Sequence, residues 1–522
     1  MNRKRQPSRH RGTERLAWSF LYLLTASFAA ADDPRPNFVF IMTDDHAYQA
    51  VSAYGSVLNE TPNIDRIANE GIRFDRCYVP NSICAPSRAT VLTGKHSSVN
   101  GVTDNYTDFD GSQWTFPKAL QAAGYQTAMV GKWHLKTDPT GFDYWDILPG
   151  QGKYYRPDFR SREGRRAVEG YVTDVTADIG IDWLEGNDGP GGPGRVDGKP
   201  FLLMLHQKAP HRPWDPAPER LQEFEDRNFP EPETLFDDYA TRTKGPRTAE
   251  MRIGDHMRVD RDVKAWAEDS NHRAWLYKHM SDGARREWQR VIDPRHEEFR
   301  DADLTGAART LWVWQHYLED YLACVASVDA SVGRLLDWLE TAGLAENTVV
   351  VYTSDQGFYL GEHGWFDKRF IYEQSLRTPM VVRWPAGLAN PGRAEGRIVS
   401  NLDIAPTFCE LAGAEPDPTM AGRSFTALLR DTQPAEWREM FYYHYHEGPD
   451  RDHAVARHDG VTDGRHKLVH FYELGDWELY DLQADPSEVK NLIDEPDYEE
   501  VEADLRSSLE EHRDAYGFTV AQ

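Results

Sequence analysis

Four short apolar runs in the sequence are each followed directly by polar side chains that can bind a metal ion or move a proton. Each run is five or six residues long, and the polar side chains begin within two positions of its end. Carboxylates and amides are ligands for hard metal ions, and histidines exchange protons near neutral pH. The runs and the residues after them are 37–42 with Asp44, Asp45 and His46, 125–130 with Lys132 and His134, 201–205 with His206, Lys208 and His211, and 349–353 with Asp355 and Gln356.

The elements that position these side chains are predicted to be strands of a parallel sheet. Apolar runs of this length are typical of strands buried on both faces. Residues 315–340 place apolar side chains at helical spacing, and residues 116–123 form a shorter helix that Gly124 ends. Strands alternating with helices predict an α/β domain, in which ligands bind beyond the carboxyl ends of the strands. Each cluster taken alone is an ordinary polar loop, but four in equivalent places favour one shared site.

The length of 522 residues and changes in character along the chain predict two domains. We expect a large α/β domain over residues 32–434, in which the densely charged residues 215–310 form a long irregular insertion with some helix. We expect a smaller α+β domain over residues 435–522. Its residues 441–445 and 467–471 alternate like strands of a half-exposed antiparallel sheet, and a closing helix follows them.

The first 31 residues read as a secretory signal peptide. Six basic residues and one acid precede an apolar stretch over residues 16–30, and three alanines at 29–31 offer small residues for cleavage. The alternative is a membrane anchor, but the apolar stretch is shorter than the roughly 20 residues that cross a bilayer. We therefore predict cleavage near Ala31, a periplasmic or secreted protein, and no stable membrane anchor.

Charge and cysteine content exclude some classes of protein. The chain holds 59 Lys and Arg against 85 Asp and Glu, a net charge of −26, and loss of residues 1–31 makes it −31. A chain this acidic repels nucleic acid at long range, so we expect no nucleic-acid partner. Four cysteines in an exported chain of this length do not make a disulfide scaffold. An anionic substrate would need a local basic pocket.

The most informative stretch is Cys-Ala-Pro-Ser-Arg at residues 84–88, followed by Leu-Thr-Gly at 92–94. This stretch resembles the signature of the formylglycine-dependent (type I) sulfatases of the alkaline phosphatase superfamily, and residues 124–134 resemble the second signature of that family. The resemblance covers roughly residues 36–492. It implies an alkaline-phosphatase-like fold: a large mixed, mostly parallel sheet sandwiched by helices, with a smaller C-terminal α+β domain that contains an antiparallel sheet.

The resemblance also implies a chemical modification at Cys84. In the family this cysteine is oxidised during export to formylglycine (3-oxoalanine), which makes a formylglycine-generating enzyme an expected partner. The alternative, a buried thiol beside a turn proline, is common for single cysteines, but the surrounding pattern favours modification. The hydrated aldehyde bears two hydroxyls, of which one attacks sulfur and the second then expels sulfate. A serine could perform the attack but not this release.

A divalent metal ion is implied by the same resemblance. Asp44, Asp45, Asp355, Gln356 and the modified Cys84 would offer hard oxygen ligands, which suit Ca²⁺ better than zinc, with Mg²⁺ as the alternative. The ion would act as a Lewis acid. Many sulfatases carry asparagine at the position of Gln356. The alternative role of the paired aspartates is a helix cap or a turn.

The remaining catalytic roles follow from the family pattern. Arg88 would hold the hydrate, and Lys132 and Lys368 would contact sulfate as preorganised positive charge. His134 would take the proton from the second hydroxyl, and His211 would protonate the leaving oxygen. Any one of these lysines taken alone reads as a solvated surface charge.

Residues 357–370 resemble bacterial sulfatases that act on N-acetylglucosamine 6-sulfate, and residues 235–239 fit the same group. On this basis the expected substrate is a sulfated carbohydrate, with the 6-O-sulfate of N-acetylglucosamine or glucosamine as the bond cleaved. A sugar ring would stack on Trp365, and polar contacts would come from His363 or Asp367, and from Gln151 near the expected mouth. The alternative for Trp365 is that it packs its loop onto the domain.

Other functions remain open at this stage. An arylsulfatase or a phosphonate or phosphate monoester hydrolase would share the scaffold, and a glycan-binding protein with an unmodified Cys84 is a more remote alternative. The sequence does not determine the oligomeric state, or whether the enzyme acts within or at the ends of a glycan.

Overall fold

The computed structural model describes residues 1–2 and 35–520, apart from 226, 267–269 and 435. The predicted signal peptide lies, after its first two residues, outside the described residues. The described residues from 35 onward belong to one compact unit, which is described below. No helix among the described residues is both long enough and apolar enough to span a bilayer.

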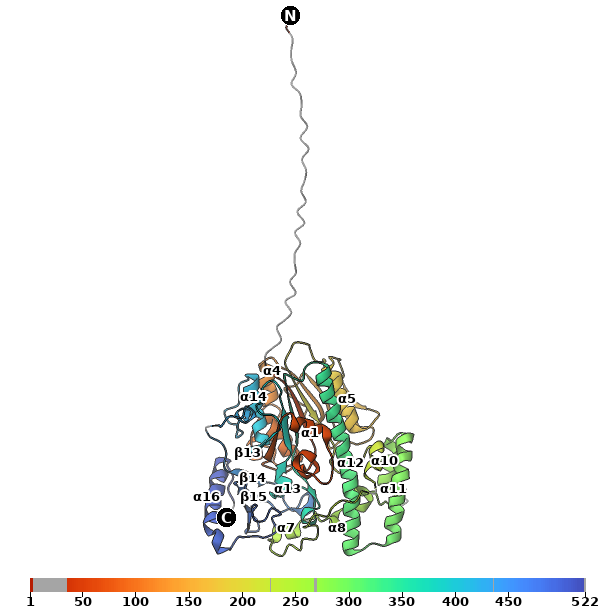
Figure 1. The fold of residues 1–522 in the computed structure, drawn as a ribbon, viewed down its shortest axis with the longest axis vertical. Helices are drawn as coiled ribbons and strands as arrows, with labels where there is room; N and C mark the ends of the chain where they lie inside the picture. Colours follow the sequence, from red (N-terminus) through yellow and green to blue (C-terminus); the bar gives the residue numbers. More distant parts are fainter. Residues whose placement is uncertain (3–34, 226, 267–269, 435, 521–522) are drawn as a thin grey trace. The chain divides into compact units, whose positions relative to one another are not determined.

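A large mixed sheet forms the centre of this unit (Figure 1). Its middle strands lie in the order β8-β1-β7-β3-β4 and run parallel, whereas β12, β5 and β6 pair antiparallel to their neighbours. The four predicted strands are confirmed and are buried along their whole length. The strands are β1 (Asn37–Thr43), β2 (Ile72–Tyr78), β3 (Gln126–Lys132), β4 (Tyr144–Leu148), β5 (Asp158–Ser161), β6 (Gly164–Ala167), β7 (Phe201–His206), β8 (Thr348–Ser354), β11 (Arg377–Thr378), β12 (Met380–Arg383) and β13 (Arg393–Ser400).

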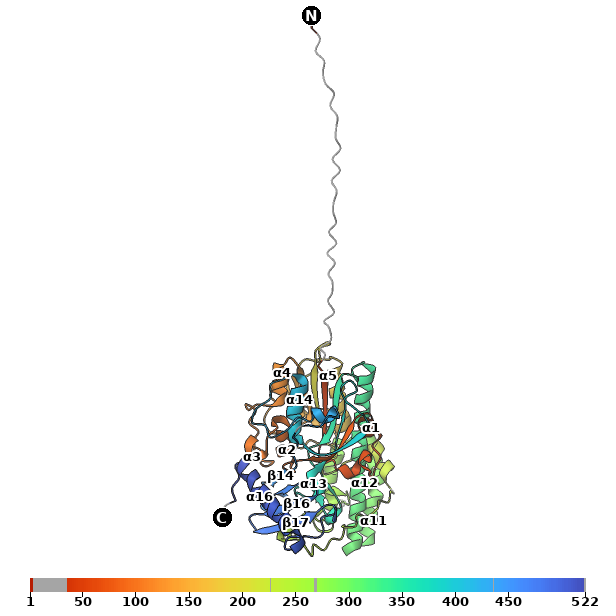
Figure 2. The ribbon, with the colours of Figure 1, turned by 60° about the vertical axis from the view of Figure 1, so that its left-hand side comes forward.

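Helices cover both faces of the sheet, as Figures 1 and 2 show. Alternate residues of a strand point to opposite faces, so Val39 and Ile41 pack with one set of helices and Phe38 and Phe40 with the other. The first set is α1 (Pro62–Asn69), α5 (Val172–Leu184) and α12 (Gly306–Thr341), and the second is α2 (Cys84–Thr93), α4 (Phe116–Ala122) and α14 (Ile404–Ala412). The expected sandwich of helices around a mostly parallel sheet is confirmed.

The charged segment 215–310 contains more helix than the sequence indicated. Its helices are α6 (Pro218–Phe224), α7 (Lys244–Thr248), α8 (Ile253–His256), α9 (Val259–Asp262), α10 (Asn271–His279) and α11 (Asp282–Ala302). Trp266 and Trp288 from this segment are buried in the same core as the sheet. The Trp288 indole donates a hydrogen bond to the Tyr155 hydroxyl at 2.6 Å. The segment is therefore packed onto the α/β unit by its own aromatic side chains.

The C-terminal sheet is antiparallel, as expected, and contains β14 (Phe441–Tyr445), β15 (His458–Thr462), β16 (His466–Phe471) and β17 (Asp476–Asp481). The expectation that one of its faces is exposed is wrong. The closing helix α16 (Glu499–Ala515) covers one face through Leu505 and Leu509, and aromatic residues of the 365–372 loop cover the other. Both faces carry apolar side chains because each has a packing partner. The domain boundary at residue 435 stays a prediction.

Candidate active site

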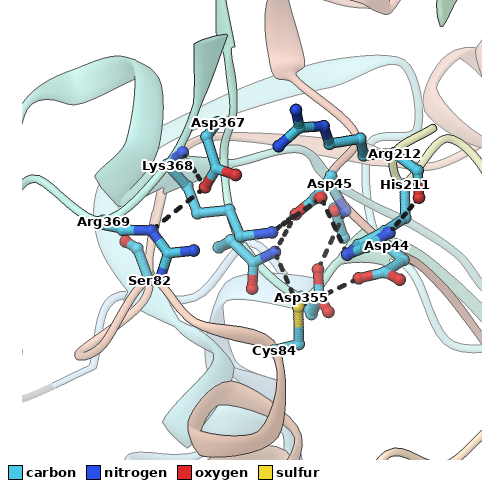
Figure 3. Close-up of polar contacts among 12 residues, drawn as sticks. Asp44, Asp45, Ser82, Cys84, His211, Arg212, Asp355, Asp367, Lys368 and Arg369 are labelled. Atoms are coloured by element: carbon cyan, nitrogen blue, oxygen red, sulfur yellow. Dashed lines mark hydrogen bonds and ion pairs between the residues drawn. The ribbon is translucent and has the colours of Figure 1, made fainter. Parts of the chain in front are cut away.

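The carboxyl ends of the middle strands meet at one edge of the sheet and bring the polar clusters together. Asp44 and Asp45 follow β1, Asp355 follows β8, which pairs with β1 along its length, and Lys132 ends β3. In Figure 3 the three carboxylates point toward one another and toward Cys84. Oxygen atoms of the three aspartates lie within 4.8 Å of one another, and all three residues are buried. The strands position the site as the sequence indicated.

Cys84 is the first residue of α2 and is fully buried. Its Sγ lies 3.4 Å from Asp44 Oδ1, and the side-chain amide nitrogen of Gln356 lies 3.9 Å from Sγ. Burial, and then the neighbouring Asp44 carboxylate, raise the pKa of the Cys84 thiol. The thiolate is the reactive form of cysteine, so an unmodified thiol in this environment is a weak nucleophile and a weak metal ligand.

Each of the three carboxylates has a buried cation beside it. Lys132 Nζ forms an ion pair with Asp44. Lys368 Nζ, which follows the short strand β10 (Phe366–Asp367), lies 2.6 and 2.8 Å from the two carboxylate oxygens of Asp45.

Arg88, one turn after Cys84 on α2, donates to Asp355 Oδ2 at 2.8 Å and to the Lys132 backbone carbonyl at 2.7 Å. The site thus holds buried positive and negative charge in matched positions, which offsets part of the cost of burying both.

The carboxylates have raised or lowered pKa values according to their surroundings. Burial and the Asp44 charge raise the pKa of Asp355 to about 7. Burial raises the pKa of Asp45 to about 6, although Lys368 opposes the shift. Burial disfavours the charged form of Asp44 as well, but Lys132 and the other cations lower its pKa well below the ordinary value. Burial and the neighbouring acids therefore disfavour the charged forms of Asp45 and Asp355, even with cations beside them.

An unpartnered oxygen completes a set of donors that fits a hard divalent cation. Gln356 donates from its amide nitrogen to Asp45 Oδ1 at 2.5 Å, and its Oε1 is buried and accepts no hydrogen bond from any described residue. Buried polar atoms in folded proteins nearly always have a partner. Three carboxylates and one free amide oxygen are the ligand types that Ca²⁺ and Mg²⁺ prefer. The residues present fit such an ion.

Two histidines at the site are arranged to handle protons. His211 Nδ1 lies 2.7 Å from the Arg212 carbonyl oxygen, so this nitrogen carries the hydrogen and Nε2, which lies 3.8 Å from an Asp45 oxygen, faces the site. His134 Nδ1 is buried and has no hydrogen-bond partner among the described residues. Burial lowers the pKa of both imidazoles well below the ordinary value. Both are neutral in this state and are able to accept a proton.

Two of the predicted substrate residues lie beside these groups. Gln151 Oε1 accepts a hydrogen bond from Lys132 Nζ at 2.5 Å. Asp367 precedes Lys368, and its Oδ2 lies 3.0 Å from His453 Nε2. Arg369 Nε lies 3.4 Å from Asp367 Oδ1. The sequence reasoning missed His453, because it comes from the C-terminal part of the chain, and Arg369, whose adjacency to Lys368 was the available signal.

The other two predicted substrate residues lie in the core, and this corrects the expectation that they contact a sugar. Trp365 is 0% exposed, and its ring stacks on Tyr239 with ring centroids 5.5 Å apart. His363 is also 0% exposed and lies between Asp237, at 3.2 Å, and Arg242, at 2.9 Å. A sugar cannot stack on a fully enclosed indole. The alternative, packing of the loop onto the domain, describes what both side chains do.

Comparison with known proteins agrees with this geometry. The family model described as Sulfatase matches residues 36–414, and the model described as N-sulphoglucosamine sulphohydrolase, C-terminal, matches residues 361–515. The chain belongs to the sulfatase family. It is therefore a sulfuric ester hydrolase, and enzymes of this family generally use formylglycine and a divalent metal ion.

Relatives of this sulfatase match it over most of its length. The N-acetylglucosamine-6-O-sulfatase of Bacteroides thetaiotaomicron is 46% identical over 515 residues, which is 95% of this chain and 90% of that protein. The N-acetylglucosamine-6-sulfatase of Capra hircus is 28% identical over 81% of this chain and 68% of its own. A solved structure described as a complex with its substrate D-glucosamine-2-N,6-O-disulfate has a TM-score of 0.89 and 46% identity, and covers 92% of this chain and 98% of that chain.

Proposed function

We propose that this sulfatase removes the 6-O-sulfate of N-acetylglucosamine or glucosamine in a sulfated carbohydrate. The observation that carries the proposal is the close similarity, over 92% of the chain, to a structure that binds a 6-O-sulfated glucosamine. The 46% identical relative, named as an N-acetylglucosamine-6-O-sulfatase, supports the same sugar. The buried cluster of cations and carboxylates around Cys84 supports chemistry on an anionic ester.

Two groups complete the proposed site. Converted to formylglycine, Cys84 would supply through its hydrate one hydroxyl that attacks sulfur and another whose deprotonation expels sulfate. Asp44, Asp45, Asp355 and Gln356 would hold Ca²⁺, or Mg²⁺ as the alternative, whose contribution is that of a Lewis acid. The free Gln356 oxygen and the matched carboxylates support this assignment.

The side chains of the chain itself carry the remaining roles. Lys132 and Lys368 would place buried positive charge beside the sulfate oxygens, whose negative charge changes during the reaction. Arg88 holds the Asp355 carboxylate in position through a hydrogen bond. His134, neutral because burial lowers its pKa, accepts the proton of the second hydroxyl. His211 presents Nε2, which carries no hydrogen in the neutral ring, to the site. When the anionic ester binds beside this ring, Nε2 would take up a proton from solvent and pass it to the leaving sugar oxygen.

Gln151 and Asp367 are proposed to contact the sugar. Each contacts a proposed sulfate-binding lysine, Gln151 through the Lys132 side chain and Asp367 through the Lys368 backbone nitrogen at 2.8 Å. A carboxylate and an amide are suited to hydrogen bonds with sugar hydroxyls. His363 and Trp365 are left out of this proposal because they are buried in the core.

The proposal includes export. Residues 1–31 would act as a signal peptide that is removed near Ala31, and the mature enzyme would work in the periplasm or outside the cell. Maturation of Cys84 would require a formylglycine-generating enzyme in the producing organism. The mature chain would comprise a catalytic domain over residues 32–434 and a smaller domain over 435–522.

Mass spectrometry of the peptide that contains Cys84, from protein purified out of its native host, tests the modification. Conversion to formylglycine lowers the mass by about 18 Da. Sulfate release is then measured on N-acetylglucosamine 6-sulfate and on an aryl sulfate, and release of the aryl alcohol is measured on an aryl phosphonate monoester. We expect the 6-sulfated sugar to be the preferred substrate. Modified, metal-replete enzyme that prefers the phosphonate, or that releases no sulfate from the sugar, would contradict the proposal.

A further inference from the structure

A cavity outside the proposed active site contains an arginine from which no described residue accepts a hydrogen bond. The cavity has a volume of about 460 Å³, which falls in the range typical of small-molecule sites. None of the predicted catalytic or metal-binding residues lines it. Its lining includes Tyr48, Tyr54, Tyr78, Arg76, Glu373 and Arg377.

Arg377 is the central feature of this cavity. It begins β11 and pairs with Tyr78 at the end of β2, which places it on the cavity wall. Its guanidinium lies 4.1 Å from the ring centroid of Tyr48 and 5.7 Å from that of Tyr54. Its Nε is buried, and no described residue accepts a hydrogen bond from this side chain or forms an ion pair with it. Aromatic faces hold the cation in place, but its planar set of donors is unused.

The acidic side chains of the cavity form their hydrogen-bonded ion pairs with cations other than Arg377. Asp75 accepts from Arg73 Nε at 2.7 Å, and Glu373 accepts from Lys467 Nζ at 3.0 Å. Arg76 donates to the Gly396 carbonyl at 3.2 Å and, among the described residues, forms no ion pair. The lining therefore carries an excess of positive charge, in a protein whose net charge is −26. Such a cavity attracts an anion locally while the rest of the surface repels it.

We propose that this cavity is a second, non-catalytic binding site for an anionic sugar unit, whose sulfate or carboxylate group accepts hydrogen bonds from Arg377 and Arg76. The paired donors of a guanidinium match the geometry of such groups. The volume exceeds that of an inorganic anion, and three tyrosine side chains line the cavity, as aromatic side chains do in sites for small organic molecules. The choice of a sugar rests on the proposed function, whereas the choice of an anion rests on the cavity alone.

Equilibrium dialysis of the full-length protein with N-acetylglucosamine 6-sulfate tests the proposal. The measurement uses a Cys84→Ala protein, which cannot turn the substrate over. The number of sugar molecules bound per chain is compared between this parent protein and the double variant that also carries Arg377→Gln. We expect the Arg377→Gln protein to bind one equivalent fewer than its parent. Arg286→Gln removes an exposed arginine on α11 that does not line the cavity, and it should leave the stoichiometry unchanged. Equal stoichiometry in the Arg377→Gln protein and its parent would overturn the proposal.

Arg76→Gln and inorganic sulfate provide a second variant and a second ligand for the same test. If Arg377→Gln does not fold, Arg76→Gln, at an exposed residue, should raise the dissociation constant of the second equivalent about fivefold. Inorganic sulfate that fills the cavity as tightly as the sulfated sugar would overturn the sugar assignment. Sulfate release by the wild-type enzyme is measured separately, so failure of the proposed function would be seen independently of this site.

Discussion

Single side chains at the site are constrained by the charges around them. Asp44, Asp45 and Asp355 are each matched with Lys132, Lys368 or Arg88 in a region closed to solvent. Removing one member of such a pair leaves an uncompensated buried charge, which is far more costly than losing an exposed ion pair. Charge-neutral or shape-conserving substitutions are therefore the informative ones here.

Gln356 offers a matched test of the metal proposal. Gln356→Leu removes the unpartnered oxygen while keeping similar volume, and we expect it to lower Ca²⁺ affinity about tenfold or more. Gln356→Asn keeps an amide oxygen on a shorter side chain and should lose less. Titration with Ca²⁺ against a competing chelator measures both. Wild-type affinity in Gln356→Leu would show that this oxygen is not a ligand.

Trp365 should contribute to stability and not to substrate binding. Trp365→Ala removes a fully buried indole that stacks on Tyr239 and Phe370, and should lower the free energy of unfolding by about 3–5 kcal/mol. Trp365→Phe should cost less and should leave KM for the sulfated sugar unchanged. Urea unfolding and steady-state kinetics measure the two effects. A several-fold rise in KM for Trp365→Phe at unchanged stability would restore the sugar-stacking role.

At the scale of elements, the C-terminal sheet depends on what covers its two faces. Strand β15 is tied to helix α16 by a buried bidentate pair, in which Arg513 Nε and one of its terminal nitrogens each lie 2.6 Å from an Asp459 oxygen. The opposite face packs on the loop that leads to Lys368. The sheet thus supports a segment that positions the site.

This pair can be tested by a double-mutant cycle. Arg513→Met leaves the Asp459 carboxylate buried without its cation and should lower the free energy of unfolding by about 3–5 kcal/mol. Arg513→Met combined with Asp459→Leu removes both charges and should recover most of that loss. Urea unfolding of the two single variants and the double variant measures the coupling. Purely additive losses would mean that the pair does not couple the helix to the sheet.

The whole molecule should lose stability in mild acid because it buries neutral histidines. Burial lowers the pKa of His458 to about 4, from an ordinary value of 6.5, and burial likewise lowers the pKa of His446 to about 4. Between these pH values the unfolded chain binds protons that the folded protein does not. The contribution of these histidines to the free energy of unfolding therefore falls as the pH falls from 6.5 toward 4. The raised pKa values of Asp45 and Asp355 act in the opposite direction over the same range, and the larger number of buried histidines outweighs them.

His458→Phe tests the contribution of one group. The ring of His458 packs among Tyr443, Tyr445 and Phe471, so phenylalanine conserves the shape. We expect the pH dependence of unfolding between pH 6.5 and 4 to decrease by about one proton in this variant, with the remaining slope due to the other histidines. Urea unfolding at a series of pH values measures the slope. An unchanged slope would show that His458 does not titrate differently on unfolding.

Much of the fold and site followed from local pattern. Strands buried on both faces of a parallel sheet must be apolar throughout, so β1, β3, β7 and β8 were visible as runs in the sequence. Because parallel strands end at one edge, residues just after them, such as Asp44 and Asp355, had to meet. These conclusions need only the order of residues and the geometry of a sheet.

Only the tertiary structure could decide which side of a loop each side chain faces. Asp367 and Trp365 are two residues apart, yet one lies beside Lys368 and the other is enclosed by Tyr239 and Phe370. The cavity around Arg377 likewise needs Tyr48, Arg76 and the strand pairing of β11 with β2. Such environments arise from segments far apart in the chain, and burial by distant partners leaves no periodic trace in the sequence.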